Sequence, residues 1–196
     1  AICHAINGAL GNAGVTVLHT DPVAAAPGSQ LQSLGELVGD INGGKVDALL
    51  VLGGNPVYDA PSDLRFGDAL EEVAFTARLG LYEDETSAIC QWHIPEAHSL
   101  EAWSDARAWD GTATIVQPLI APLYGGRSAH EMLIGLSPTP GRAAYDAVRE
   151  TWAQEAARSG VLDTEAFWRT AVHDGVVAPA DLETVLEVSD DPYVIA

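Results

Sequence analysis

The stretch VDALLVLGGNPVYDAPSD, residues 46–63, contains the pattern that decides the fold. Residues 46–52 are mostly apolar, which is typical of a strand buried on both faces of a parallel sheet. The strand runs into Gly53 and Gly54, which tolerate a positive φ, and then into the turn residues Asn55 and Pro56. Ligands of doubly wound α/β folds bind beyond the carboxyl ends of the strands, so this turn is a candidate binding site.

Strand and helix patterns alternate on both sides of this stretch. The predicted strands are residues 15–19, 46–52, 75–83, 92–95 and 112–120. The predicted helices are residues 2–10, 33–42, 62–73, 85–90 and 128–136, with further helix after residue 143. Short connections between alternating elements favour an α/β fold with an open, mainly parallel, Rossmann-like sheet and helices on both faces.

Two local patterns refine this prediction. Ser33 with Glu36 three residues later predicts a capping box at the start of the second helix. The sequence PTPG at 138–141 is a clear break, so we expect a domain at 1–136 and a helical extension at 137–196.

The charge of the chain restricts its partners. The formal net charge is −19, from 28 acidic and 9 basic residues. Such a surface repels phosphate backbones, so we expect no nucleic-acid partner. No apolar run reaches the roughly 18 residues that a membrane span needs, so we expect no direct membrane span.

The cysteines and the first residue add two expectations. Cys3 and Cys90 are far apart in the sequence and form no C-x-x-C motif, so these residues alone hold neither an iron–sulfur cluster nor a cysteine-type zinc site. The chain begins without Met, in what reads as a helix already in progress, so we expect a segment of a longer polypeptide.

Two clusters of polar residues have ordinary explanations. His93, Glu96 and His98 invite a zinc interpretation, but Pro95 interrupts the helix that such spacing requires, so hydrogen-bonded side chains are the default. The acidic run at 83–85 is better explained as a solvated turn or a helix N-terminus than as a catalytic pair.

Residues 46–63, followed by LYEDETSAICQWHIPEAHSLEAW at 81–103, resemble the third domain of the molybdopterin oxidoreductase family. In that family a buried strand leads to Gly-x-Asn-Pro, and a later strand leads to a Glu-Thr turn, a short strand ending in Leu-Pro and a further Glu. The matching residues here are Glu85-Thr86, Ile94-Pro95 and Glu101. The stretch at 110–133 resembles the family's Gly-x-x-Gln-Pro connection to a helix. The resemblance covers about residues 1–136.

Two further stretches narrow the resemblance. Residues 93–131 and AFWRTAVHDGVV at 166–177 are similar to the large iron–sulfur subunit of alternative complex III, a bacterial quinol-oxidising respiratory assembly. The resemblance implies a subunit that keeps the molybdopterin-enzyme fold without the molybdopterin, with its iron–sulfur clusters in another domain. It also implies a location on the periplasmic side of the inner membrane. The implied partners are other domains of the parent chain and subunits of a membrane-associated respiratory complex.

The resemblance points to six residues as the cofactor-binding candidates, because the family binds its dinucleotide at these positions. They are Gly53, Gly54, Asn55, Pro56, Glu85 and Thr86. The alternative is that these residues keep only a turn geometry. We expect no catalytic residues and no metal ligands here.

Departures from the family pattern favour a domain without a cofactor. Cys90-Gln91 replaces the usual Ala-Asp, and Glu101-Ala-Trp-Ser replaces Glu-x-x-Gly-Thr. Bulky tryptophans add to this, at positions 92, 103 and 109. We therefore expect a scaffolding domain of a respiratory subunit. The alternatives are the molybdopterin-guanine-dinucleotide domain of an active molybdenum enzyme and a stand-alone nucleotide-binding module.

Overall fold

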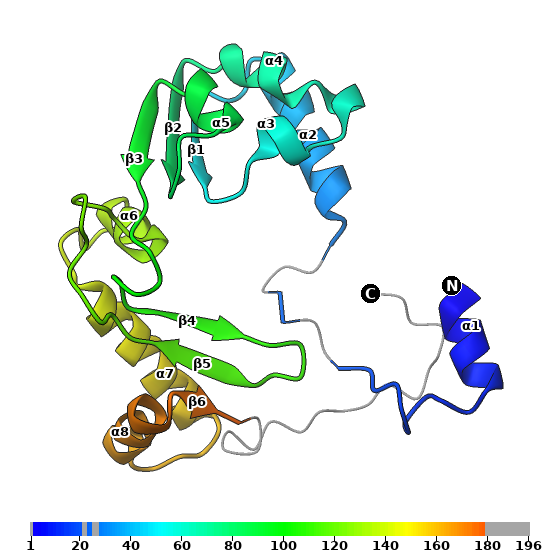
Figure 1. Ribbon diagram of the computed structural model, residues 1–196, viewed down its shortest axis with the longest axis vertical. Coiled ribbons are helices and arrows are strands. Elements are labelled where there is room, and N and C mark those ends of the chain that lie inside the picture. Colours follow the sequence, from blue (N-terminus) through cyan, green and yellow to red (C-terminus); the bar gives the residue numbers. More distant parts are fainter. Residues whose placement is uncertain (1, 21–22, 25–27, 179–196) are drawn as a thin grey trace. The chain divides into compact units, whose positions relative to one another are not determined.

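The computed structural model describes residues 2–20, 23–24 and 28–178 (Figure 1). The chain forms two compact units, each assembled from separate stretches. Unit 1 comprises Ala1–Gly28, Asp105–Ile115 and Arg149–Ala196, and unit 2 comprises Ser29–Ser104 and Val116–Val148. The division of the sequence at residue 136 stays a prediction.

Unit 2 contains the predicted parallel sheet. Its strands are β1 (Ala48–Leu52), β2 (Phe75–Gly80) and β3 (Trp92–Pro95), hydrogen-bonded in the order β1-β2-β3. Both pairings are parallel, and Val51, Arg78 and His93 lie side by side across the sheet. The mixed α/β class and the parallel sheet are therefore confirmed. The strand predicted at 75–83 ends earlier, at Gly80.

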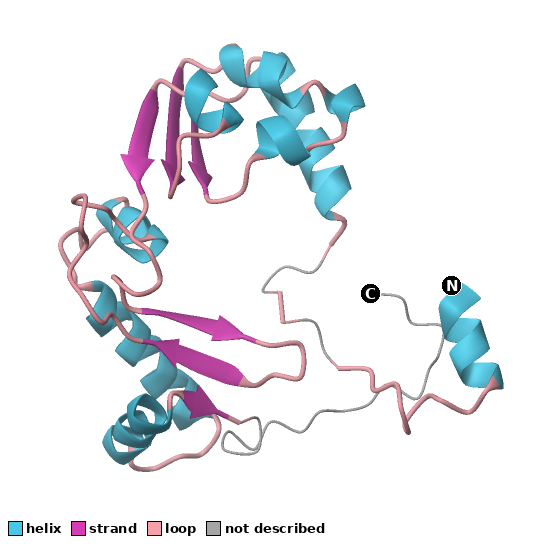
Figure 2. Cartoon of the chain, in the orientation of Figure 1, coloured by secondary structure: helices cyan, strands magenta, loops and turns pink. Residues whose placement is uncertain are grey.

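Four helices pack on one side of this sheet, as Figure 2 shows: α2 (Gln30–Asn42), α3 (Pro56–Asp59), α4 (Phe66–Glu71) and α5 (Glu85–Ile89). Their shared core contains Val38, Ile41, Phe66 and Leu70, with Leu49 of β1 packed against it. Burial of these apolar side chains is the main force that fixes the helices to the sheet. Helices on both faces are not confirmed, and the Rossmann-like topology stays a prediction.

Two predicted helices in unit 2 differ from the observed ones. Helix α2 begins one turn earlier than expected, because Ser29 rather than Ser33 accepts the capping hydrogen bond, from the backbone N–H of Gln32. The helix expected at 62–73 is split into a 3₁₀ turn, η1 (Ser62–Leu64), and α4, because Arg65 between them has a left-handed φ of 48°. The helix predicted at 128–136 is confirmed as α6 (Ala129–Gly135), which begins with a complete capping box between Ser128 and Glu131.

The strand predicted at 15–19 is also wrong, because this part of unit 1 forms only an isolated bridge between Ala13 and Val17. The remaining helices are α1 (Ile2–Ala9), α7 (Ala144–Arg158) and α8 (Thr164–Asp174). A second sheet contains β4 (Ser104–Arg107), β5 (Ala113–Val116) and β6 (Val176–Val177). The predicted extension is thus helical over most of its described length, but β6 pairs antiparallel with β5. Its residues 179–196 lie outside the described part of the chain.

Over the described residues, no helix combines the length and the apolar character that a membrane crossing requires.

Candidate functional site

The turn after β1 has the backbone geometry that its sequence predicts. Gly53 and Gly54 both have a left-handed φ, 64° and 65°, which costs a residue with a Cβ about 1–2 kcal/mol. The N–H of Gly53 donates to the carbonyl oxygen of Leu79 at 3.0 Å, so the turn is tied to the end of β2. Pro56 then starts α3 at a position where a missing N–H costs nothing.

The side chain of Asn55 connects this turn to α5. Its Nδ2 donates to Glu85 Oε2 at 2.7 Å. Its Oδ1 accepts from Thr86 Oγ1 at 2.7 Å and from the Thr86 backbone N–H at 3.3 Å. Thr86 Oγ1 in turn accepts from the backbone N–H of Val57 at 3.1 Å. Three of the six predicted residues, Asn55, Glu85 and Thr86, thus bond directly to one another, and we call these three the Asn55 cluster.

The Asn55 cluster uses most of its own hydrogen-bonding capacity. Both acceptor positions of Asn55 Oδ1 are filled, and one Nδ2 hydrogen remains for another partner. Thr86 is fully buried. The hydrogen bond from Asn55 is the main cause that lowers the pKa of Glu85, so its carboxylate is ionised at neutral pH. The cluster therefore presents a negative charge at its exposed end.

A buried ion pair supports the cluster, and the sequence prediction missed it. Arg78 of β2 donates from Nη2 to Asp84 Oδ2 at 2.7 Å and from Nη1 to the carbonyl oxygen of Leu79 at 2.7 Å. Asp84 caps α5 by accepting from the backbone N–H of Ser87 at 2.9 Å. The bond from Arg78 is the largest cause that holds the pKa of Asp84 far below its usual range.

One sequence feature pointed to this ion pair. Arg78 is a charged residue within the otherwise uncharged strand FTARLG, and an arginine in a central strand needs a partner. The helix N-terminus proposed for the acidic run at 83–85 is confirmed, with Asp84 as its cap. The choice of Asp84 over Glu83 as the partner depends on the path of the chain.

A pocket of about 460 Å³ adjoins the predicted turn. Its lining includes Gly54, Asn55 and Pro56, but neither Glu85 nor Thr86. The opposite wall is formed by Leu31 and Leu34 of α2, with further residues Gln30, Asp59, Ala60 and Pro61. Its one charged side chain is a carboxylate, which repels phosphate. The side chains of this pocket therefore offer a diphosphate no positive charge.

The three basic residues between positions 29 and 80 add no free positive charge. Lys45 pairs with Asp40, Arg65 with Asp68, and Arg78 with Asp84. Arg127 lies at the carboxyl end of β3, where its backbone bonds to Pro95 and Ala97. Arg127 is exposed.

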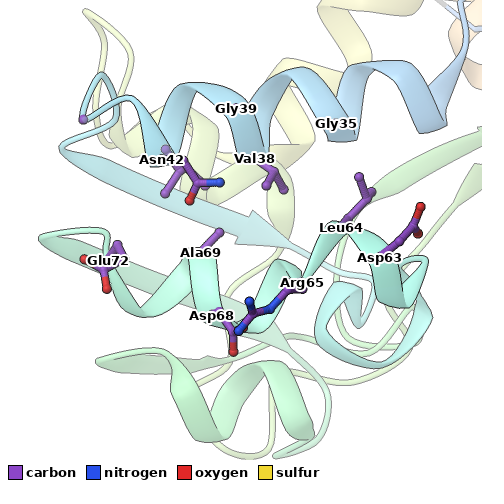
Figure 3. A pocket seen from close by; sticks show the side chains of 12 residues that line it. Gly35, Val38, Gly39, Asn42, Asp63, Leu64, Arg65, Asp68, Ala69 and Glu72 are labelled. Atoms are coloured by element: carbon purple, nitrogen blue, oxygen red, sulfur yellow. The ribbon is translucent and has the colours of Figure 1, made fainter.

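A second pocket, of about 770 Å³, lies between α2 and α4 (Figure 3). None of the six predicted residues lines it. Its charged lining residues are Asp63, Asp68 and Glu72, together with Arg65, which pairs with Asp68. This pocket is therefore no better suited to an anion than the first.

The histidines considered as metal ligands have hydrogen-bond partners. His93 Nδ1 lies 3.0 Å from Ser87 Oγ, and His98 Nδ1 accepts from the backbone N–H of Leu100 at 3.2 Å. Within the described residues, no three His, Cys, Asp or Glu side chains gather closely enough to hold a metal ion.

Glu101, part of the family resemblance, braces a loop. Its carboxylate accepts from the backbone N–H of His98 at 3.1 Å and from that of Leu123 at 3.3 Å. Nearby, the Trp103 ring packs edge-on against Tyr145, with ring centroids 4.9 Å apart. These contacts give Glu101 and Trp103 structural roles in unit 2.

One comparison with known proteins is informative. Over 93 residues, the chain is 34% identical to the menaquinone reductase, molybdopterin-binding-like subunit of Nitratidesulfovibrio vulgaris. This similarity supports a relationship to molybdopterin-oxidoreductase-like proteins. The match covers 45% of this chain and 14% of the relative's length. No protein-family model matches the chain.

Proposed function

We propose that this chain is a scaffolding domain of a molybdopterin-oxidoreductase-like subunit in a respiratory electron-transfer complex, and that it carries out no catalysis by itself. The observation that carries the proposal is the Asn55 cluster. Its hydrogen bonds close the turn after β1 onto α5, so three of the six residues that would hold a nucleotide bind one another. The sequence similarity to a menaquinone reductase subunit supports the assignment to a respiratory complex.

Charge supports the absence of a dinucleotide. At a diphosphate site, Lys or Arg side chains beside the turn offset the phosphate charge. Glu85 and Asp59 instead place carboxylates beside it, and the guanidinium of Arg78 is buried against Asp84. In this proposal the electron-carrying iron–sulfur clusters belong to other parts of the parent protein. The partners are the neighbouring domains and subunits of a membrane-associated complex.

The specific assembly proposed is a quinol-oxidising one of the alternative complex III type, on the periplasmic side of the bacterial inner membrane. The sequence resemblance at 93–131 and 166–177 supports this assignment. The name of the relative, a menaquinone reductase subunit, points to a different reaction, and the scaffolding role is proposed for this domain in either assembly.

A second candidate is the dinucleotide-binding domain of an active molybdenum enzyme. Two observations favour it: the left-handed Gly53-Gly54 backbone permits a close approach to a ligand, and Arg127 is an exposed cation at the carboxyl end of β3. In this case Arg127→Ala would weaken nucleotide binding, whereas it leaves a scaffold unaffected.

Metal analysis separates the two candidates. The native protein, purified with the chains that accompany it, is analysed for molybdenum and tungsten by mass spectrometry and for released guanine nucleotide by chromatography. The scaffolding proposal predicts iron from the clusters elsewhere, but neither molybdenum nor tungsten bound through this domain. Stoichiometric molybdenum or tungsten together with guanine nucleotide would overturn it.

A further inference from the structure

The loop between β2 and α5 has little apolar packing to hold it. Leu81, Tyr82 and Glu83 are all exposed. Ser87 Oγ lies 3.4 Å from the carbonyl oxygen of Tyr82, a long hydrogen bond. Because exposed side chains gain little from burial, another contact must fix the point at which this loop enters α5.

The ion pair between Arg78 of β2 and Asp84 supplies that contact. The side chain of Arg78 is 5% exposed and that of Asp84 is 20% exposed, so their bond is largely shielded from water. The same guanidinium donates to the carbonyl oxygen of Leu79, at the end of β2. One side chain thus joins the last residues of the strand to the first turn of the helix that follows.

Gly80 provides the room that this guanidinium occupies. A Cβ built at position 80 would lie 3.0 Å from Arg78 Cζ and 3.1 Å from its Nη2. These distances are shorter than ordinary van der Waals contacts. The absence of a side chain at position 80 and the placement of the Arg78 guanidinium therefore depend on each other.

We infer that Arg78 is a positioning residue for the Asn55 cluster: through Asp84 it fixes the first turn of α5 where Glu85 and Thr86 meet Asn55. The Arg78 side chain bonds to Asp84 and to the carbonyl oxygen of Leu79, not to the three residues of the cluster, so it acts through the helix cap. Replacing a buried ion pair by apolar residues often leaves stability unchanged. The pair therefore contributes mainly to the choice of one loop conformation. The inference deepens the proposed function, because it names what keeps the turn closed.

The test replaces the ion pair without removing the cap. In the double variant Arg78→Met/Asp84→Asn, asparagine still caps the helix and methionine fills the buried space, so the fold is retained. The pKa of Glu85 is then measured by NMR titration of its carboxyl carbon. This readout reports on the bond from Asn55 and is not moved by a change in global stability of a folded protein.

The two outcomes have opposite signs. The charge of Asp84 raises the pKa of Glu85, so its removal alone lowers that pKa. If the double variant frees α5 from its position, the bond from Asn55 is lost and the pKa of Glu85 rises instead toward its ordinary value of about 4.3. A rise is the expected result, and an unchanged or lower pKa would overturn the inference.

Two further variants calibrate the experiment. Asn55→Ala removes the hydrogen bond to Glu85 directly, so it gives the full rise in the pKa of Glu85 that loss of this bond can cause. Gly80→Ala displaces the Arg78 guanidinium by a few tenths of an ångström and replaces the double variant if that variant does not fold. A smaller rise in the pKa of Glu85 then supports the inference, and no rise counts against it. The titration needs neither cofactor nor partner, so its failure is distinct from failure of the proposed function.

Discussion

The two loops that follow β1 and β2 are fixed in different ways. After β1, the backbone itself determines the path: Gly53 and Gly54 adopt left-handed φ values and Pro56 starts the next helix. After β2, a buried charge pair does so, because Asp84 reaches back to Arg78. The first loop depends on residues adjacent in sequence, and the second on a contact between a strand and a helix cap. The difference predicts which substitutions each loop tolerates.

The largest effect is expected where the second loop loses its carboxylate. Asp84→Ala leaves Arg78 buried without its partner and removes the cap of α5, so the free energy of unfolding should fall by about 3 kcal/mol. Urea denaturation measures this loss. Asp40→Ala, which removes the partner of the exposed Lys45, is the control and should change stability little. Equal effects in the two variants would show that the Arg78 pair is no stronger than a surface pair.

Acid should remove the same contribution. The pKa of Asp84 is lowered on folding, so its contribution is complete above its unfolded pKa of about 4 and is lost as the pH falls toward the folded value. The stability difference between the native protein and Asp84→Ala should be constant near neutral pH and shrink below about pH 4. A difference that grows in acid would contradict the assigned sign.

The next effect concerns the contact between the two loops. Asn55→Ala removes the bonds to Glu85 and Thr86 and leaves the buried Thr86 without its acceptor, so stability should fall by about 2 kcal/mol. Denaturation of this variant is compared with that of Asn42→Ala, at the exposed end of α2. If both variants lose the same stability, the Asn55 side chain does not connect the loops.

A smaller effect isolates the backbone of the first loop. Gly53→Ala should lose about 1 kcal/mol, because alanine disfavours the left-handed φ. Gly39→Ala, in the middle of α2, should gain about 1 kcal/mol through higher helix propensity. A Cβ meets nothing within 4 Å at either position, so the opposite signs come from the backbone alone. Thermal denaturation of both variants checks this, and equal signs would refute it.

The smallest effect tests a strained position between η1 and α4. Arg65 is the non-glycine residue with a positive φ among the described residues. Arg65→Gly should gain about 0.5 kcal/mol, since relief of the left-handed strain exceeds the entropy cost of glycine. Arg65→Ala keeps the strain and serves as the control. Calorimetry that finds no difference between these variants would show that the strain is negligible.

Local sequence patterns predicted the first loop well. The apolar run of β1 and the paired glycines encode structure through adjacent residues, and each lies where expected. The errors arose where tertiary contacts decide. Ser29 and Ser33 are both acceptable caps, and the choice depends on where α2 meets its core. Among the described residues, no strand pairs with the β-branched run at 15–19, which forms one bridge between Ala13 and Val17.

The candidate site shows the same division. Gly53, Gly54 and Pro56 were predictable as a turn, and the family resemblance brought Asn55 together with Glu85 and Thr86. Whether these residues hold a cofactor stays a prediction. The partner of Arg78 was not predictable, because the path of residues 81–84 determines which carboxylate it reaches.

Titration calorimetry with guanosine diphosphate tests most directly whether the Asn55 cluster closes the turn to nucleotides. We expect no binding to the native protein at millimolar nucleotide. Saturable binding that is lost in Asn55→Ala would contradict it, and would assign the turn after β1 to a dinucleotide instead.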